Sequence, residues 1–153
     1  MSTHQKLIES GYIPQQKLQS RKIISTQEEG IKYVLNIPDD NESVVYQVDG
    51  YIIKNGEKCD KLILVKSTEY PETWIEIFLE LKGRDVNHAL TQIIQTAKSP
   101  IFYHQSNVCR RARVVARSFP SNNSNPHVER KKRELYSMGI DYRGLKPNQI
   151  DYL

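Results

Sequence analysis

The sequence predicts a protein of the α/β class, in which strands and helices follow one another along the chain. Two runs rich in Ile, Leu, Val and Phe, at residues 59–66 and 74–82, have the composition of β-strands. An amphipathic helix at 86–98 follows them, then a strand at 110–119 and a charged helix at 127–138. Strand and helix patterns in this order are typical of an α/β protein.

The N-terminal part predicts one helix and two strands. A short helix spans about residues 3–10 and is stopped by Gly11 and Pro14. Residues 22–25 and 31–37 are expected to be strands, and the second run alternates polar and apolar residues as a half-buried strand does.

The segment between these two strands also allows a helix. Ser25 to Glu28 reads Ser-Thr-Gln-Glu, which is a capping box that can begin a helix. The turn at 38–41, Pro-Asp-Asp-Asn, ends this element in either case.

The remaining connections are predicted from strand composition and turn residues. Val44 to Ile53 is expected to be a strand, and Asn55-Gly56 within the turn 54–57 can take the positive φ angles of a hairpin. Three further segments are assigned: a loop at 67–73, a polar loop from Asn122 to Pro126, and a short strand or tail from Ile140.

Length and charge limit the classes of protein to consider. A chain of 153 residues is expected to form a single domain, 1–153, with its core at about 22–120 and a basic helix and C-terminal tail at 121–153. The net charge of +4 and the pI near 9.0 are compatible with nucleic-acid binding.

Cysteine use and the N-terminal residues predict a cytoplasmic protein. Cys59 and Cys109 form neither a disulfide framework nor a metal-binding spacing, which favours a reducing compartment. The first six residues lack the apolar centre of a signal peptide, and no run approaches membrane-spanning length, so we expect no membrane association.

Two carboxylates and a lysine are expected to meet at one end of the sheet. Glu80 and Lys82 point to the same face of their strand because side chains alternate along a strand. If the two apolar strands pair as a hairpin, Asp60 at the start of the first lies close to Glu80 at the end of the second. A divalent cation would neutralise these carboxylates, and the lysine could hold a water or a developing oxyanion.

This pattern resembles the PD-(D/E)xK nuclease superfamily, which has the restriction-endonuclease-like fold. The resemblance covers about residues 48–98. It is carried by Val48-Asp49-Gly50, Lys58-Cys59-Asp60, Leu79-Glu80-Leu81-Lys82-Gly83, and a following helix with Ala89, Gln92 and Thr96. It implies a mixed central sheet flanked by helices, with an αβββαβ core. It also implies a Mg²⁺ or Mn²⁺ site made by Asp60, Glu80 and the backbone carbonyl of Leu81, with Lys82 and Gln92 as further catalytic residues.

Some of these residues have plainer interpretations. The Glu-x-Lys tripeptide also occurs at Glu129-Arg130-Lys131, in a stretch that looks helical, which shows how easily it arises by chance. Glu80 and Lys82 could instead cover a solvated strand face, and Gln92 could be an ordinary boundary glutamine. His88 lies off the apolar face of its helix and is expected to be solvated.

Basic residues gather towards the C-terminus. Strand alternation places Arg111, Arg113 and Arg117 on one face, and Lys131 and Lys132 follow on the charged helix. Arginine and lysine suit phosphate contacts, so we predict that these residues bind nucleic acid. Long solvated side chains on a sheet face are the alternative interpretation.

The predicted function is that of a Mg²⁺-dependent endonuclease that hydrolyses DNA phosphodiester bonds. Members of the superfamily that the chain resembles act in restriction, phage defence and repair. The alternative is a catalytically inactive nucleic-acid-binding or protein-binding subunit on the same fold. A homodimer is expected, because one such site cuts one strand; a subunit of a larger complex is the other possibility.

Overall fold

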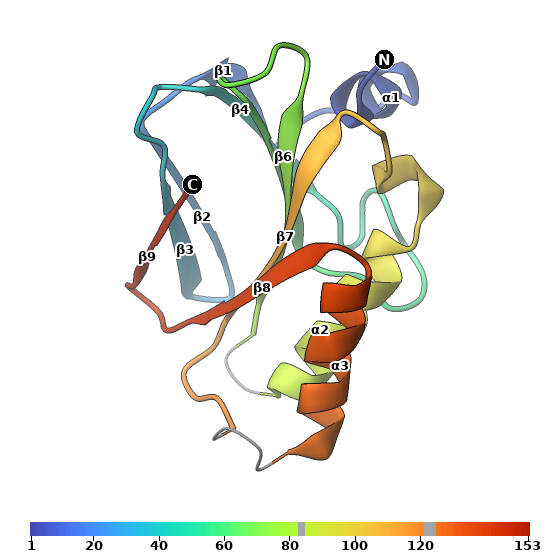
Figure 1. Cartoon of the computed structure of the whole chain (residues 1–153), viewed down its shortest axis with the longest axis vertical. Helices are drawn as coiled ribbons and strands as arrows, with labels where there is room; N and C mark the ends of the chain where they lie inside the picture. Colours follow the sequence, from blue (N-terminus) through green and yellow to red (C-terminus); the bar gives the residue numbers. More distant parts are fainter. Residues whose placement is uncertain (83–84, 121–124) are drawn as a thin grey trace.

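The computed structural model describes residues 1–82, 85–120 and 125–153, and it shows an α/β fold with two sheets (Figure 1). The elements are α1 (Thr3–Glu9), β1 (Gln16–Ser20), β2 (Ile23–Glu28), β3 (Ile31–Asn36), β4 (Glu42–Gln47), β5 (Lys61–Lys66), β6 (Trp74–Leu81), α2 (Val86–Ala97), the 3₁₀ helix η1 (Pro100–Phe102), β7 (Asn107–Val115), α3 (Pro126–Ser137), β8 (Ile140–Leu145) and β9 (Ile150–Tyr152).

The larger sheet is mixed, as predicted. Its strand order is β1-β4-β5-β6-β7-β8, and the pairs from β1 to β6 are antiparallel, whereas β7 runs parallel to both β6 and β8. The elements α1, β4, β5, β6, α2 and β7 follow one another in the expected αβββαβ order, with β1, β2 and β3 inserted after α1.

The two faces of the larger sheet are covered differently. Helices α2 and α3 cover one face, and the small sheet β2-β3-β9 lies against the other (Figure 1). Strand β5 shows why both covers form: Leu62 and Leu64 pack towards the helices, while Ile63 and Val65 pack towards the small sheet. A strand that is apolar on both faces must be buried on both. The structure thus confirms a mixed sheet flanked by helices, with the small sheet as the cover of the other face.

Helix α2 confirms the predicted amphipathic helix. Its apolar residues, which include Ala89, Leu90 and Ile93, are buried against the larger sheet. Asp85 caps its N-terminus by accepting a hydrogen bond from the backbone N–H of His88. This helix places its first turns beside the end of β6.

The helix that the capping box at Ser25 allows does not form. Residues 25–28 belong to β2, which pairs with β3 over its whole length. Ile24 and Thr26 are buried while Ser25 is exposed, the alternation of a half-buried strand. Pairing with β3 and burial of Ile24 override the local capping signal.

Several strand boundaries differ from those predicted, most clearly those of β4 and β7. The strand expected at 44–53 ends at Gln47, because the chain then turns, with the N–H of Ile53 donating to the carbonyl of Val48. The Asn55-Gly56 turn therefore belongs to a long connection, not to a tight hairpin. Strand β7 covers Asn107–Val115 instead of 110–119.

Strands β1 and β9 were not expected from the sequence. Each pairs with a strand distant in the chain, β1 with β4 and β9 with β3. Gly83 and residues 122–124 of the predicted polar loop lie outside the described residues. In the described part of the chain, no helix combines the length and apolar character needed to cross a membrane.

Candidate active site

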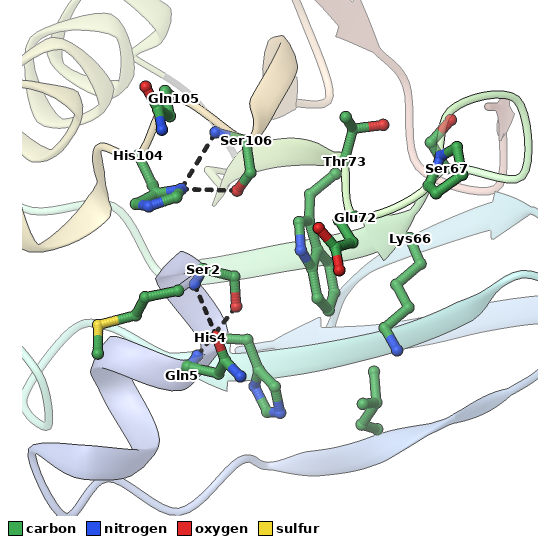
Figure 2. Close-up of a pocket in the computed structure, with 14 residues that line it drawn as sticks. Ser2, His4, Gln5, Lys66, Ser67, Glu72, Thr73, His104, Gln105 and Ser106 are labelled. Atoms are coloured by element: carbon green, nitrogen blue, oxygen red, sulfur yellow. Dashed lines mark hydrogen bonds between the residues drawn. The ribbon is translucent and has the colours of Figure 1, made fainter.

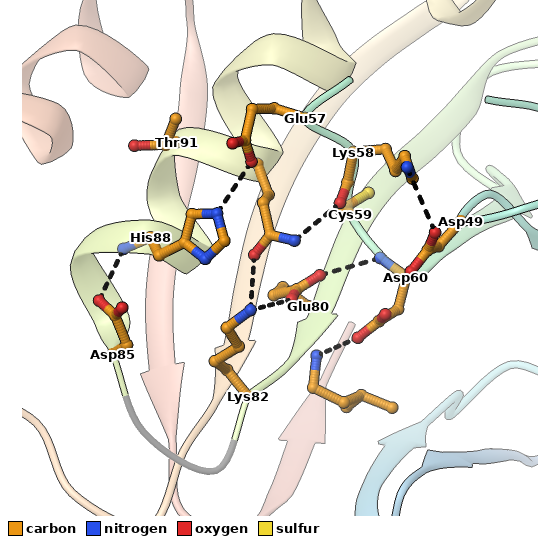
Figure 3. Close-up of polar contacts among 12 residues, drawn as sticks. Asp49, Glu57, Lys58, Cys59, Asp60, Glu80, Lys82, Asp85, His88 and Thr91 are labelled. Atoms are coloured by element: carbon orange, nitrogen blue, oxygen red, sulfur yellow. Dashed lines mark hydrogen bonds and ion pairs between the residues drawn. The ribbon is translucent and has the colours of Figure 1, made fainter. Parts of the chain in front are cut away.

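The structure brings Asp60 and Glu80 together as predicted. Strands β5 and β6 pair antiparallel with Lys61 opposite Leu79, and this register places Asp60 opposite Glu80. The N–H of Asp60 donates to Oε1 of Glu80 at 3.0 Å, and Oδ2 of Asp60 accepts from the N–H of Leu81 at 2.8 Å (Figure 3). Each carboxylate is thus held by the backbone of the opposite strand.

Burial makes ionisation of this carboxylate pair, Asp60 and Glu80, unfavourable. Asp60 is 7% exposed and Glu80 2%. Burial raises the pKa of Asp60, although the hydrogen bond from the Leu81 N–H opposes this. Burial, and secondarily the charge of Asp60, raise the pKa of Glu80 to about 8, while the charge of Lys82 acts in the opposite direction. Two buried carboxyl groups whose pKa values are both raised favour the uptake of a proton or of a compensating cation.

Lys82 and Gln92 lie beside the pair. Nζ of Lys82 is 3.6 Å from Oε2 of Glu80 and donates a hydrogen bond to Oε1 of Gln92 at 3.1 Å (Figure 3). Within the described residues, Lys82 is the one lysine or arginine within 4 Å of a carboxylate oxygen of the pair. One ammonium group offsets only part of the charge of two carboxylates.

Helix α2 also positions the segment that leads into Asp60. Nε2 of Gln92 donates to the backbone carbonyl of Lys58 at 3.1 Å. One helical turn further on, Oγ1 of Thr96 accepts from the N–H of Cys59 at 2.8 Å. Gln92 therefore connects Lys82 to the backbone next to Asp60.

The donor atoms of this site suit a hard divalent cation. Mg²⁺ is commonly bound through one or two carboxylates and keeps several waters. Asp60 and Glu80 together supply two carboxylates, which is within this range. Among the described residues, no group of three or more His, Cys, Asp or Glu side chains is placed to hold a metal.

In the described part of the chain, the second Glu-x-Lys copy has different surroundings from the first. Glu129 lies on α3, as the helical pattern predicted, and its carboxylate pairs with Lys132 three residues later at 3.2 Å. A helix brings no opposing strand or facing aspartate, so the tripeptide at 129–131 serves as an internal comparison for Glu80.

The prediction that Arg113 contacts nucleic acid is wrong. Its side chain is 1% exposed and lies between the two sheets, where Nε is 2.9 Å from Oδ2 of Asp151 on β9. The same Oδ2 accepts from the Tyr33 hydroxyl at 2.5 Å. Alternation correctly placed Arg111 and Arg113 on one face, but the small sheet covers that face.

Arg111 and Arg117 have different surroundings. Arg111 is half-buried and donates to the carbonyl of Tyr152 at 3.3 Å. Arg117 is exposed and follows the end of β7, where Val115 pairs with Leu81. Arg117 therefore lies at the same end of the sheet as the carboxylate pair, although it is not part of the strand.

The two predicted lysines of α3 make contacts within the protein. Nζ of Lys131 donates to Oδ1 of Asn87 in the first turn of α2 at 2.6 Å. Lys132 pairs with Glu129 and lies over the ring of Tyr142, 5.7 Å from its centroid. Lys131 thus lies near the start of α2, while Lys132 mainly joins α3 to β8.

A further polar pair borders the site. Nε2 of His88 is 3.0 Å from Oε2 of Glu57, and both side chains are partly exposed, at 43% and 45% (Figure 3). His88 precedes Gln92 by one helical turn on α2. We expected a solvated His88, and no local pattern could predict its contact with Glu57, because the two residues are 31 positions apart.

Comparisons with known proteins identify no relative: no family model, no curated protein and no solved structure matches this chain.

Proposed function

We propose that this protein is a metal-dependent nuclease that hydrolyses phosphodiester bonds of DNA. The observation that supports it most strongly is the buried pair of Asp60 and Glu80 with Lys82 beside it. Such a pair is costly to keep charged without a compensating cation. A structural role alone would be served as well by apolar residues of similar size.

Asp60, Glu80 and the carbonyl of Leu81 would hold Mg²⁺ or Mn²⁺. The bound ion would lower the pKa of a water and stabilise negative charge on the phosphate. Lys82, whose side chain is 27% exposed, is placed to orient the attacking water or to stabilise charge on a phosphate oxygen. Hydrolysis forms a bond from the water oxygen to phosphorus and breaks the bond from phosphorus to the leaving sugar oxygen.

Gln92 acts as a positioning residue. Its amide oxygen accepts from Lys82 and its amide nitrogen donates to the carbonyl of Lys58, so it fixes the direction of the ammonium group. Among the described residues, Arg117 and Lys131 lie at the same end of the sheet and would attract the DNA backbone.

The test is cleavage of supercoiled plasmid by the pure protein with Mg²⁺, with Mn²⁺ and with EDTA. We expect cleavage with either metal and none with EDTA. Mg²⁺-independent DNA binding without cleavage would support the inactive nucleic-acid-binding subunit instead. Neither binding nor cleavage would support the protein-binding subunit.

The proposal includes a homodimer, because one site of this kind cuts one strand and a two-fold pair would place two sites on antiparallel strands. Light scattering is expected to give twice the chain mass of 17.8 kDa. A strict monomer that yields only nicked circles would contradict the dimer while leaving the nuclease intact.

A further inference from the structure

Helix α3 presents a row of three side chains to solvent. Arg130, Arg133 and Tyr136 follow one another at three-residue intervals, so they are neighbours along one face of the helix. All three are exposed, Tyr136 at 84%. The apolar residues Val128 and Leu135 lie on the other side of the helix and are buried in the core. The row of Arg130, Arg133 and Tyr136, called the α3 row below, therefore contributes little to the packing of the fold.

Both arginines of the α3 row lack an ion pair within the part of the chain that the structure describes. Each has a glutamate four positions away on the helix, a spacing that allows such a pair. Of these two glutamates, Glu129 pairs with Lys132 at 3.2 Å and Glu134 with Lys98 at 3.5 Å. The guanidinium groups are thus neighbouring like charges, which do not favour the helix that carries them. Their charge is available to an anionic partner.

The α3 row begins near the end of the sheet that holds the carboxylate pair. Helices α2 and α3 lie side by side, and Nζ of Lys131 donates to Oδ1 of Asn87 in the first turn of α2 at 2.6 Å (Figure 1). That turn follows the end of β6 and lies beside the site. From Arg130 to Tyr136 the helix rises about 9 Å. The α3 row therefore extends along the flank of the molecule, starting next to the site.

A hollow at the opposite end of the larger sheet has a different charge pattern (Figure 2). It measures about 690 Å³ and is bordered by α1, by the start of β6 and by residues 104–106. Its lining includes Lys66, which already pairs with Glu42 at 3.3 Å, and the carboxylate of Glu72. A polyanion would meet a negative charge there, whereas on α3 it would meet two arginines that are free to bind it.

We propose that the α3 row binds the sugar-phosphate backbone of duplex DNA on which the carboxylate site acts. The inference rests on the nuclease function proposed above, because it names the surface along which that substrate lies. Guanidinium groups form charge-assisted hydrogen bonds with phosphate oxygens, and a tyrosine hydroxyl can donate to a phosphate as well. Phosphates succeed one another every 3.4 Å or so along a strand, so a row of about 9 Å spans about three of them. Each side chain thus contacts a phosphate of its own, without reading the base sequence.

The test is the affinity of the full chain for a duplex of about 30 base pairs, roughly 100 Å long, at several sodium chloride concentrations. EDTA is present, so that the measurement does not depend on cleavage. Arg130→Gln combined with Arg133→Gln should weaken binding by about tenfold at low salt. The slope of log affinity against log salt should fall by about 1.8, the value for two phosphate contacts. Arg130→Lys combined with Arg133→Lys keeps both charges and should keep the slope.

Lys17→Gln combined with Lys32→Gln is the matched control, because it removes the same charge from exposed positions on β1 and β3. It should change the affinity and the slope far less. Thermal unfolding of both double variants should match that of the wild type, since all four side chains are exposed. Equal losses in the two double variants, no loss in the arginine variant, or no salt-dependent binding by the wild type would overturn the proposal.

Two further outcomes separate this proposal from its neighbours. Tighter binding of an RNA duplex of the same length would overturn DNA as the partner. Plasmid cleavage by the wild type, with unchanged DNA binding in the arginine variant, would reject the α3 row and leave the nuclease intact. A reduced salt slope in that variant without any plasmid cleavage would reject the nuclease and support the α3 row as a DNA-binding surface.

Discussion

The backbone N–H of Asp60 donates a hydrogen bond to the Glu80 carboxylate at 3.0 Å. The Asp60 carboxylate in turn accepts a hydrogen bond from the backbone N–H of Leu81, the residue after Glu80. These contacts hold two acidic groups together in a buried place. The pKa of each carboxyl is raised, chiefly by burial. The protein is therefore expected to respond to pH and to divalent cations through this pair.

The free energy of unfolding of the metal-free protein should fall as the pH rises from about 4.5 to about 8. A carboxyl group whose pKa is higher in the folded state binds more protons there, so its stabilising contribution is complete below the unfolded pKa. That contribution is lost as the pH passes the folded value of Glu80, about 8. The free energy of unfolding should fall by up to about 1.4 kcal/mol per pH unit for each proton that the folded state binds in excess of the unfolded state. Urea unfolding at several pH values with EDTA measures it.

Glu80→Gln isolates the contribution of this group. Glu76 is also buried, and burial raises its pKa to about 7, so it adds a slope of the same sign. Glu76 contributes equally to both proteins. Subtracting the pH dependence of the free energy of unfolding of Glu80→Gln from that of the wild type therefore cancels the Glu76 contribution. The variant should be the more stable of the two at pH 8, because a buried charge is gone. Parallel pH profiles for the two proteins would show that Glu80 ionises as it does in water.

Mg²⁺ should stabilise the wild type more at pH 8 than at pH 5, because protons compete with the ion for Asp60 and Glu80. Glu80→Gln should lose this stabilisation and should lower plasmid cleavage by about a thousandfold or more. Thermal unfolding with and without Mg²⁺ measures the first effect. Glu129→Gln in the second Glu-x-Lys copy is the matched control and should behave as the wild type does. A metal-dependent shift that survives in Glu80→Gln would place the ion elsewhere.

Lys82→Ala should lower the rate of cleavage by about 10²–10³ while affecting DNA affinity much less, because its role is at the reacting phosphate. Gln92→Ala should have a smaller effect, about tenfold, because it acts through Lys82. The double variant tests this dependence: once Lys82 is absent, loss of Gln92 should cost little more. Additive losses, or a loss of affinity as large as the loss of rate, would contradict these roles.

Local patterns predicted the strands and the helix that build the site. Apolar composition located β5 and β6, and pairing between neighbours in the chain then placed Asp60 opposite Glu80. The small sheet could not be predicted in the same way, because β9 pairs with β3 more than a hundred residues earlier. No local pattern indicated that its strands would cover Arg113. Burial by a distant segment is thus the physical reason that the basic face was misjudged.

Replacing Arg113 should lower the stability of the fold, whereas replacing Arg117 should weaken DNA binding. Arg113→Leu should lower the free energy of unfolding by about 3–5 kcal/mol, because it leaves Asp151 buried with less compensation. Adding Asp151→Leu should recover part of that loss, since both charges are then removed. Arg117→Gln should leave unfolding unchanged but weaken DNA binding and reduce the salt dependence by about one phosphate contact. Urea unfolding and DNA binding at several salt concentrations separate the two. Unaltered DNA binding in Arg117→Gln would mean that this end of the sheet does not contact the backbone.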